Sequence, residues 1–358
     1  MSSKKLLKTI LLQLALLGTG IFVDAKVTLP KLVSDGMVLQ RDQKVKIWGN
    51  ADISENIIIQ FQNKKYKTKA NNQGYWEIHL PKMKAGGPFK MTINEISLND
   101  ILIGDVWLAS GQSNMELPMR RVKTVYGDEL NNANNTNIRF FTVPQKYNFK
   151  KAEVDLSDGK WESTNKETIK EFSAAAYFFA QQINQKYNIP VGIIHSSLGG
   201  SPIQSWMDAA SLKKYPESLE EAEKWKNDAL IKETESKEQS LSQAWYSELN
   251  QSDIGLHQNW KDENHDDSDW KKINIPGSWE DLEGSYDGSV WFRKEINLTA
   301  GNENDSAFLN LGRIKDADET YINGVKVGNV NYEYPLSWYT IRKGVLKRGK
   351  NVIIVRVI

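Results

Sequence analysis

The pentapeptide GQSNM (111–115) directly follows an apolar run, residues 103–109. A serine hydroxyl is a useful nucleophile only when a base takes its proton and donors stabilise the oxyanion. A tight turn from a strand into a helix exposes the hydroxyl and aims backbone N–H groups at the developing charge. Gly111 would permit that turn. The pattern predicts Ser113 as a nucleophile at a strand end; the alternative is that Ser113 or Asn114 only caps a helix.

A second small-residue loop, Gly199-Gly200, follows the apolar run 191–195. Because ligands bind at the carboxyl ends of strands in an open α/β sheet, this loop and GQSNM could line one crevice. Gly199 and Gly200 are therefore candidate oxyanion donors, the alternative being a plain turn. Gln112 and Trp206 are weaker candidates for substrate contacts.

A base for Ser113 is harder to find among the four histidines. His195 ends the run 191–195 near the expected crevice, where a structural or substrate-contacting role is favoured over a base. Asp262 and His265 have Asp-x-x-His spacing, but they lie in an acidic segment expected to be a solvated loop. His79 and His257 have no partner in the sequence.

The sequence shows few residues that could bind a metal ion or a cofactor. The chain has no Cys, which excludes disulfides, thiolate zinc sites and a Cys nucleophile. The acidic segment 262–269 fails as a calcium loop because Asp267 stands where Gly is needed. Asp316 and Asp318 are expected to turn the chain rather than bind an ion. We predict no metal and no cofactor.

Composition and the amino terminus set the broad class. A net charge of +1 over 358 residues gives no reason to expect nucleic acid as a partner. The twelve Trp suggest β-sandwich cores more than sugar-stacking surfaces. Residues 1–25 read as a signal peptide with a basic start and a short apolar stretch. The mature protein is expected to be exported, periplasmic or secreted, without a membrane anchor; the sequence does not indicate an oligomeric state.

The chain divides by pattern into three parts after the signal peptide. Residues 26–102 read as an all-β sandwich, and residues 103–248 alternate strand and helix, which predicts a parallel α/β sheet. One helix is predicted with a face made of Phe172, Ala175, Ala176, Phe179, Ala180, Ile183 and Tyr187, ended by Asn188 and Pro190. Residues 249–358 are β-rich again. The expected strands are 45–48, 57–61, 75–80, 89–93, 103–109, 137–143, 191–195, 290–294, 307–311, 319–322 and 351–358, with a hairpin turn at 322–325.

Several segments resemble the sialate O-acetylesterases, a family of the serine esterase group named SGNH. The resemblance covers essentially all of residues 27–358. It rests on LVSDGMVLQRD (32–42), AGGPF (85–89), GDVWLASGQSNMELPM (104–119), IPVGIIHSSLGGSPIQSWM (189–207), IPGSWE with DGSVWFRK (275–294) and YINGVKVG (321–328).

This resemblance implies a fold and a reaction. The fold would be an incomplete flavodoxin-like hydrolase domain over 103–248, with an N-terminal β-sandwich before it and an inserted galactose-binding-like jelly roll over 249–358. The reaction would be removal of acetyl groups from an acetylated glycan or sialic acid without metal or cofactor. Ser113 would be the nucleophile, and Gly200, alone or with Gly199, would match the glycine block of the oxyanion hole.

The chain also departs from the family pattern. A W-x-Q-G-E-type segment and a late Asp-x-x-His block, which carries the general base, are not found after residue 294. The chain therefore reads as an N-terminal portion cut within the jelly roll, and we expect little Ser113-dependent turnover from it. The alternatives are a catalytically incomplete carbohydrate-binding protein on the esterase scaffold and an esterase that uses His195 or His265 as its base.

Overall fold

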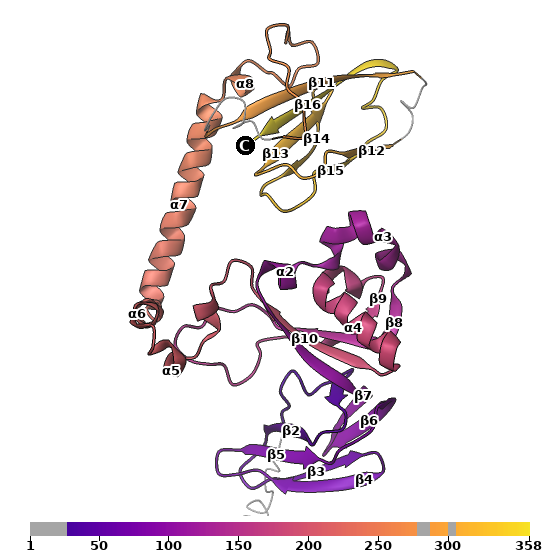
Figure 1. Ribbon diagram of the computed structural model, residues 1–358. Helices are drawn as coiled ribbons and strands as arrows, with labels where there is room; N and C mark the ends of the chain where they lie inside the picture. The colour runs from indigo at the N-terminus through magenta and orange to yellow at the C-terminus, as the bar shows by residue number, and fades with distance from the viewer. Residues whose placement is uncertain (1–26, 278–286, 300–305) are drawn as a thin grey trace, which may run out of the picture. The chain divides into compact units, whose positions relative to one another are not determined.

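The computed structural model describes residues 27–277, 287–299 and 306–358. The predicted signal peptide, residues 1–25, lies outside these ranges. The chain forms two compact units, Met1–Lys226 and Asn227–Ile358, each with its own sheets (Figure 1). Within the described ranges, none of the helices combines the length and the apolar character that a membrane span requires.

The strands of unit 1 form one large mixed sheet and one small sheet. The large sheet has the order β4-β3-β6-β7-β10-β8-β9, with β1 paired to β7, and the small sheet pairs β2 with β5. Their bounds are β1 (Val38–Gln40), β2 (Val45–Asn50), β3 (Asn56–Phe61), β4 (Lys64–Lys69), β5 (Tyr75–Leu80), β6 (Gly86–Ile93), β7 (Ile96–Gly111), β8 (Asn134–Thr142), β9 (Trp161–Asn165) and β10 (Val191–Ser197).

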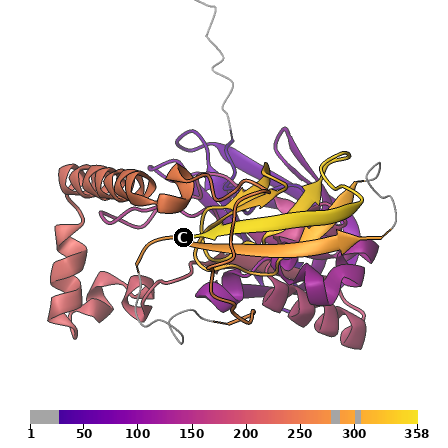
Figure 2. The ribbon, with the colours of Figure 1, turned by 90° about the horizontal axis from the view of Figure 1, so that it is seen from above.

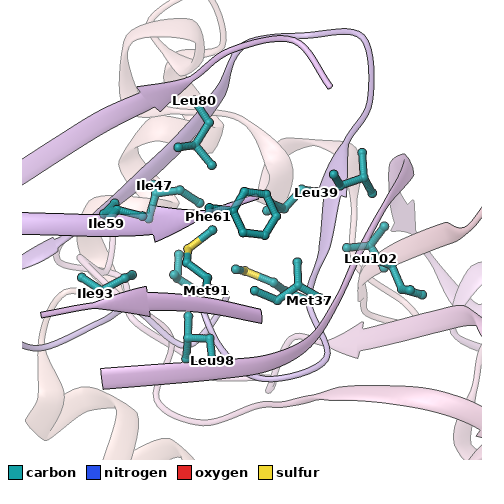
Figure 3. Close-up of a cluster of buried hydrophobic side chains, with 14 of the residues drawn as sticks. Met37, Leu39, Ile47, Ile59, Phe61, Leu80, Met91, Ile93, Leu98 and Leu102 are labelled. Atoms are coloured by element: carbon teal, nitrogen blue, oxygen red, sulfur yellow. The ribbon is translucent and has the colours of Figure 1, made fainter. Parts of the chain in front are cut away.

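Strands β2 to β6 enclose a shared apolar core, as a β-sandwich requires. Along β3 the side chains alternate between exposed and buried, which is the pattern of a strand with one face on a core. Figure 3 shows side chains from β2, β3, β5 and β6 converging, Phe61 and Met91 among them. The sequence reading missed β4, because its lysine-rich residues carry no apolar pattern; it is an edge strand paired only with β3 among the described strands.

Strand β7 is continuous across residues 102 and 103, where the pattern of the sequence changes. Up to Ile103 it pairs antiparallel with β6, and from Asp105 to Gly111 it pairs parallel with β10. The same apolar cluster that fills the sandwich also includes Phe141 and Trp161 from the α/β part. The two parts of unit 1 therefore share a strand and a core.

Three parallel strands carry the α/β part, in the order β7-β10-β8. A flavodoxin-like sheet places the first strand between the second and third, whereas here β10 lies between β7 and β8. The flavodoxin-like description thus stays a prediction. The helices are α2 (Ser113–Glu116), the 3₁₀ turn η1 (Met119–Val122), α3 (Lys123–Asn132), η2 (Thr168–Glu171), α4 (Ala174–Tyr187), η3 (Ile203–Trp206), α5 (Ala209–Leu212) and α6 (Pro216–Lys224).

Helix α4 packs on β10 and β8 with a face that agrees only in part with the predicted one, since Ala176 and Ala180 are buried as expected. Its buried side chains are Ala174, Ala176, Tyr177 and Ala180, while Ala175, Phe179 and Tyr187 are exposed. Phe172 is buried but precedes the helix, which begins after the Ser173 N-cap. The predicted helix end is confirmed, because Asn188 is a left-handed C-cap.

Unit 2 contains a long helix and two antiparallel sheets. The larger sheet has the order β11-β16-β13-β14, and the smaller one pairs β12 with β15; Figure 2 shows β11 and β16 side by side along their lengths. The elements are α7 (Asp228–Ser252), α8 (Ile254–His257), β11 (Val290–Leu298), β12 (Ala307–Asn310), β13 (Asp318–Ile322), β14 (Val325–Val330), β15 (Trp338–Ile341) and β16 (Gly349–Val357).

Two local predictions for unit 2 are confirmed: the hairpin turn at 322–325 and the place of tryptophans in the core. Asn323 and Gly324 both have positive φ, 50° and 81°, between β13 and β14, as the primed hairpin turn requires. Trp291 is buried, and Trp260 and Trp270 pack against it in the core. A jelly-roll topology stays a prediction.

Candidate active site

The carboxyl ends of β7, β10 and β8 bring the two predicted loops together. The N–H of Leu198, after β10, donates to the carbonyl of Gly111 at the end of β7 over 3.0 Å. Gly199 lies so close to the elbow that a methyl group on its Cα would stand 3.4 Å from Ser113 Cβ. The predicted crevice at the strand ends is thus where GQSNM and the double glycine meet.

Ser113 is the first residue of α2, and its side chain is exposed. Gly111 has a φ of 142°, outside the range that L side chains favour, and Gln112 is the extended N-cap. The helix-cap alternative for Ser113 is therefore wrong, since Gln112 holds that position. In a helix start of this kind the N–H groups of Ser113 and Asn114 have no intrahelical acceptor.

Glu116 connects the loops from all three strands. Its Oε2 accepts the N–H of Gly199 over 2.5 Å, and its Oε1 accepts the Nε2 of Gln145, in the loop after β8, over 2.8 Å. The same Gln145 amide reaches the carbonyl of Ser197 at 3.2 Å. One carboxylate thus joins the start of α2 to the loops after β10 and β8.

The candidate substrate residues Gln112 and Trp206 both hold the double-glycine loop. Gln112 donates its side-chain amide to the carbonyl of Ser201. Trp206 donates its indole N–H to Ser201 Oγ over 3.0 Å, and that hydroxyl donates to the carbonyl of Leu198 over 2.6 Å. Their polar groups are engaged in the fold, and a substrate role for either stays a prediction.

His195 lies beneath the site rather than beside Ser113. Its Nε2 is 2.6 Å from Ser197 Oγ and 3.1 Å from the carbonyl of Met115, and its buried Nδ1 has no partner among the described residues. Burial lowers the pKa of His195, outweighing the hydrogen bond to the carbonyl of Met115 and the charge of Glu116, which raise it. The His195 imidazole is therefore neutral near pH 7 and buried in the fold. Ser113 Oγ has no hydrogen-bond partner in the part of the chain that the structure describes.

The acidic segment around His265 is a loop with exposed residues, as predicted, but it also holds a buried cation. The backbone of this segment surrounds Arg293, whose guanidinium is almost fully buried. The guanidinium donates hydrogen bonds to the carbonyls of Trp260 and Asp262 over 2.7 and 2.9 Å. The His265 ring packs against Trp260 in a tilted arrangement and against Trp270 edge to face. The segment is ordered because this cation needs its carbonyls.

The two aspartates of unit 2 were expected to turn the chain, and Asp318 does not. It is the first residue of β13, is buried, and accepts hydroxyl hydrogen bonds from Thr320, Ser337 and Tyr339 at 2.7 to 2.8 Å. Across the described ranges, His, Asp and Glu side chains form no group of three or more placed to hold a metal ion.

Comparison with known proteins places this site in a class of enzymes. Residues 103–249 match the family model for carbohydrate esterases of the sialic acid-specific acetylesterase type. The sialate O-acetylesterases of Pongo abelii and Homo sapiens are each 28% identical to the chain over 202 residues, 51% of this chain and 39% of theirs. The chain thus spans about two fifths of the length of these curated relatives.

A solved structure supports the same family. A carbohydrate acetylesterase from Xanthomonas citri matches 52% of this chain and 44% of its own with a TM-score of 0.50 and 38% identity. The family resemblance seen in the sequence is confirmed by these comparisons.

Glu116 and Gln145 were missed as site residues by the sequence reading. Both carry a usable signal: Glu116 is a carboxylate one helical turn after Ser113, and Gln145 is a polar residue just after a predicted strand. The strand-end argument that selected Gly199 applies equally to Gln145.

Proposed function

We propose that the protein is a carbohydrate O-acetylesterase of the sialate type, with Ser113 as its nucleophile. The observation that carries the proposal is the exposed Ser113 hydroxyl at the start of α2, directly beside the glycine loop after β10. The family match over residues 103–249 supports the chemical class. The substrate would be an acetylated glycan or sialic acid.

The reaction would proceed by acyl transfer. Ser113 Oγ attacks the acetyl carbonyl carbon, its proton passes to a base, and the oxyanion is held by the N–H groups of Ser113 and the glycine loop. The sugar oxygen leaves with a proton, and water then hydrolyses the acetyl-serine to acetate. A serine site without its base retains only the part of catalysis that oxyanion stabilisation and binding supply.

The test uses an added base, because Ser113 Oγ has no hydrogen-bond partner among the described residues. The 358-residue chain is assayed on an aryl acetate and an acetylated sugar, with and without added imidazole, beside Ser113→Ala. We expect slow Ser113-dependent turnover that imidazole raises about tenfold or more, because a general base contributes roughly 10²–10⁴-fold to such reactions. Ser205→Ala removes an exposed hydroxyl elsewhere in the unit and controls for unspecific effects.

Equal rates for the chain and Ser113→Ala, at every imidazole concentration, would contradict the proposal. Subtraction of the Ser113→Ala rate also removes the direct reaction of imidazole with the ester, so the comparison remains clean.

A second candidate is a carbohydrate-binding protein built on the esterase scaffold. It is favoured by one observation: among the described residues, no side chain accepts a proton from Ser113 Oγ. This candidate predicts saturable binding of an acetylated sugar, measured by calorimetry, with no release of acetate even when imidazole is present.

A further inference from the structure

We infer that Glu116 is a positioning residue of the Ser113 site: its carboxylate takes up the N–H of Gly199 and so leaves the N–H of Gly200 as the oxyanion donor of the glycine loop. The inference rests on the proposed esterase function and separates the roles of two neighbouring glycines.

The contact between Glu116 and the loop is short and charged. The N–H of Gly199 donates to a carboxylate oxygen over 2.5 Å, so the hydrogen bond is charge-assisted. A methyl group on Gly199 would come within 2.8 Å of the same oxygen. Gly199 therefore presses directly against the carboxylate as well as against Ser113.

Glu116 is held in the frame of the nucleophile. It lies three residues after Ser113 in α2, so one turn of helix fixes the relation between the two side chains. Its second oxygen is held by Gln145, which also contacts the carbonyl of Ser197 at the end of β10. The Glu116 carboxylate thus connects the glycine loop to the helix that carries Ser113. Gln145, in the loop after β8, holds the carboxylate in place.

The two glycines differ in what their N–H groups can do. A developing oxyanion near Gly199 would have to compete with the Glu116 carboxylate for the hydrogen bond of the Gly199 N–H. The negative charge of that carboxylate would also repel the oxyanion. Gly200 has a φ of 75°, and nothing lies within 4 Å of the position a Cβ would occupy. The loop is therefore open beside the Cα of Gly200, whereas Gly199 packs against Glu116 and Ser113.

The catalytic arm of the test compares Glu116→Ala and Glu116→Gln on the aryl acetate with imidazole present. We expect the alanine variant to lose about 10- to 100-fold in kcat with KM changed less than about threefold, since a displacement of about 1 Å can cost 10²-fold. The glutamine variant should recover most of kcat, because its carbonyl can still accept the N–H of Gly199. Glu171→Ala, which loses an ion pair with Arg120, is the matched control and should leave kcat unchanged.

The second arm needs no turnover. The chain is labelled with ¹⁵N-glycine, the Gly199 amide is assigned by its loss in Gly199→Ala, and its hydrogen exchange is followed. We expect exchange at least about tenfold faster in Glu116→Ala than in the wild type or Glu116→Gln, while the amide of Gly104, within β7, is unchanged.

The outcomes separate the two claims. Faster Gly199 exchange in a chain without any Ser113-dependent turnover would overturn the esterase proposal and support the Glu116 contact. Unchanged exchange and unchanged kcat in Glu116→Ala would overturn the inference and leave the esterase proposal intact. Equal loss in Glu116→Ala and Glu116→Gln would also overturn it, because the hydrogen bond to Gly199 survives in the glutamine variant.

Discussion

At the scale of single residues, His195 shows how position in a sequence and role in a site can differ. A histidine at the end of a strand beside a nucleophile reads as a candidate base. In the structure its Nε2 is shared between Met115 and Ser197, and the ring is buried. It supports the backbone behind Ser113 and takes no part in holding the hydroxyl.

The burial of His195 predicts that this residue makes the stability of the protein depend on pH. The pKa of His195 lies below its usual 6.5 in the folded chain. As the pH falls below about 6.5, His195 becomes protonated in the unfolded chain but stays neutral in the folded chain. The free energy of unfolding therefore falls until the pH reaches the lower pKa of the folded state. Above about 6.5 its contribution is fully present. His195→Gln keeps a donor near Nε2 and has no such titration.

Urea unfolding at pH 8 and pH 5 measures the effect. We expect the unfolding free energy of the wild type to drop more between these pH values than that of His195→Gln. Parallel behaviour of the two proteins would show that His195 titrates alike in the folded and unfolded chain.

At the scale of elements, Arg139 joins the two parts of unit 1. This buried side chain on β8 donates to the carbonyls of Gly36 and Asp100 at 2.8 and 2.5 Å, and to the Asp100 carboxylate at 2.8 Å. These acceptors precede β1 and lie within β7. The shared strand β7 and this guanidinium explain why the sandwich and the α/β sheet form one unit.

Arg139→Met is expected to destabilise unit 1 by about 2–3 kcal/mol, since it leaves buried carbonyls without the charged donor. Thermal or urea unfolding measures the change. Arg41→Met is the matched control: it removes the partially exposed pair between Arg41, directly after β1, and Asp105 of β7, and a smaller change is expected. An equal loss from both variants would mean that burial of Arg139 is unimportant.

Element type could be predicted from the sequence, and tertiary contacts could not. Apolar runs identified β2, β3, β5, β6, β8 and β10, and turn residues located the elbow. The face of α4 was predicted only in part: Ala176 and Ala180 are buried as predicted, but Tyr177 is buried in place of Phe179. The period of apolar residues fits two overlapping faces, and the small side chains of the buried one let the helix approach the sheet closely. The bond between Glu116 and Gly199 spans 83 residues, which no local pattern reveals.

At the scale of the whole molecule, two units with separate cores should unfold separately, because chains of several domains depart from two-state behaviour. Unit 2 depends on one buried ion pair. Arg356 on β16 donates to Asp253 Oδ2 over 2.7 Å, and both side chains are at most 4% exposed. Asp253 also caps α8 and accepts the indole N–H of Trp291 on β11. The pair therefore joins the end of α7 to the sheet.

The electrostatics of Asp253 agree with this role. Burial alone would raise the pKa of its carboxyl, but hydrogen bonds from Ser289 and Trp291 and the charge of Arg356 outweigh it and hold the pKa below the usual 3.8. This contribution to stability is complete above about pH 3.8 and is lost as the pH falls through the lower folded pKa.

Arg356→Met should destabilise unit 2 by about 3–5 kcal/mol, because removing one partner leaves a buried charge uncompensated. Hydrogen exchange resolves the units: we expect faster exchange in β16 and β11 and no change in β10. Lys350→Met, which removes an exposed ion pair with Glu295 between the same two strands, should change neither region. Faster exchange in β10 as well would show that the two units unfold as one, and unchanged exchange in β16 would show that the buried pair contributes little to unit 2.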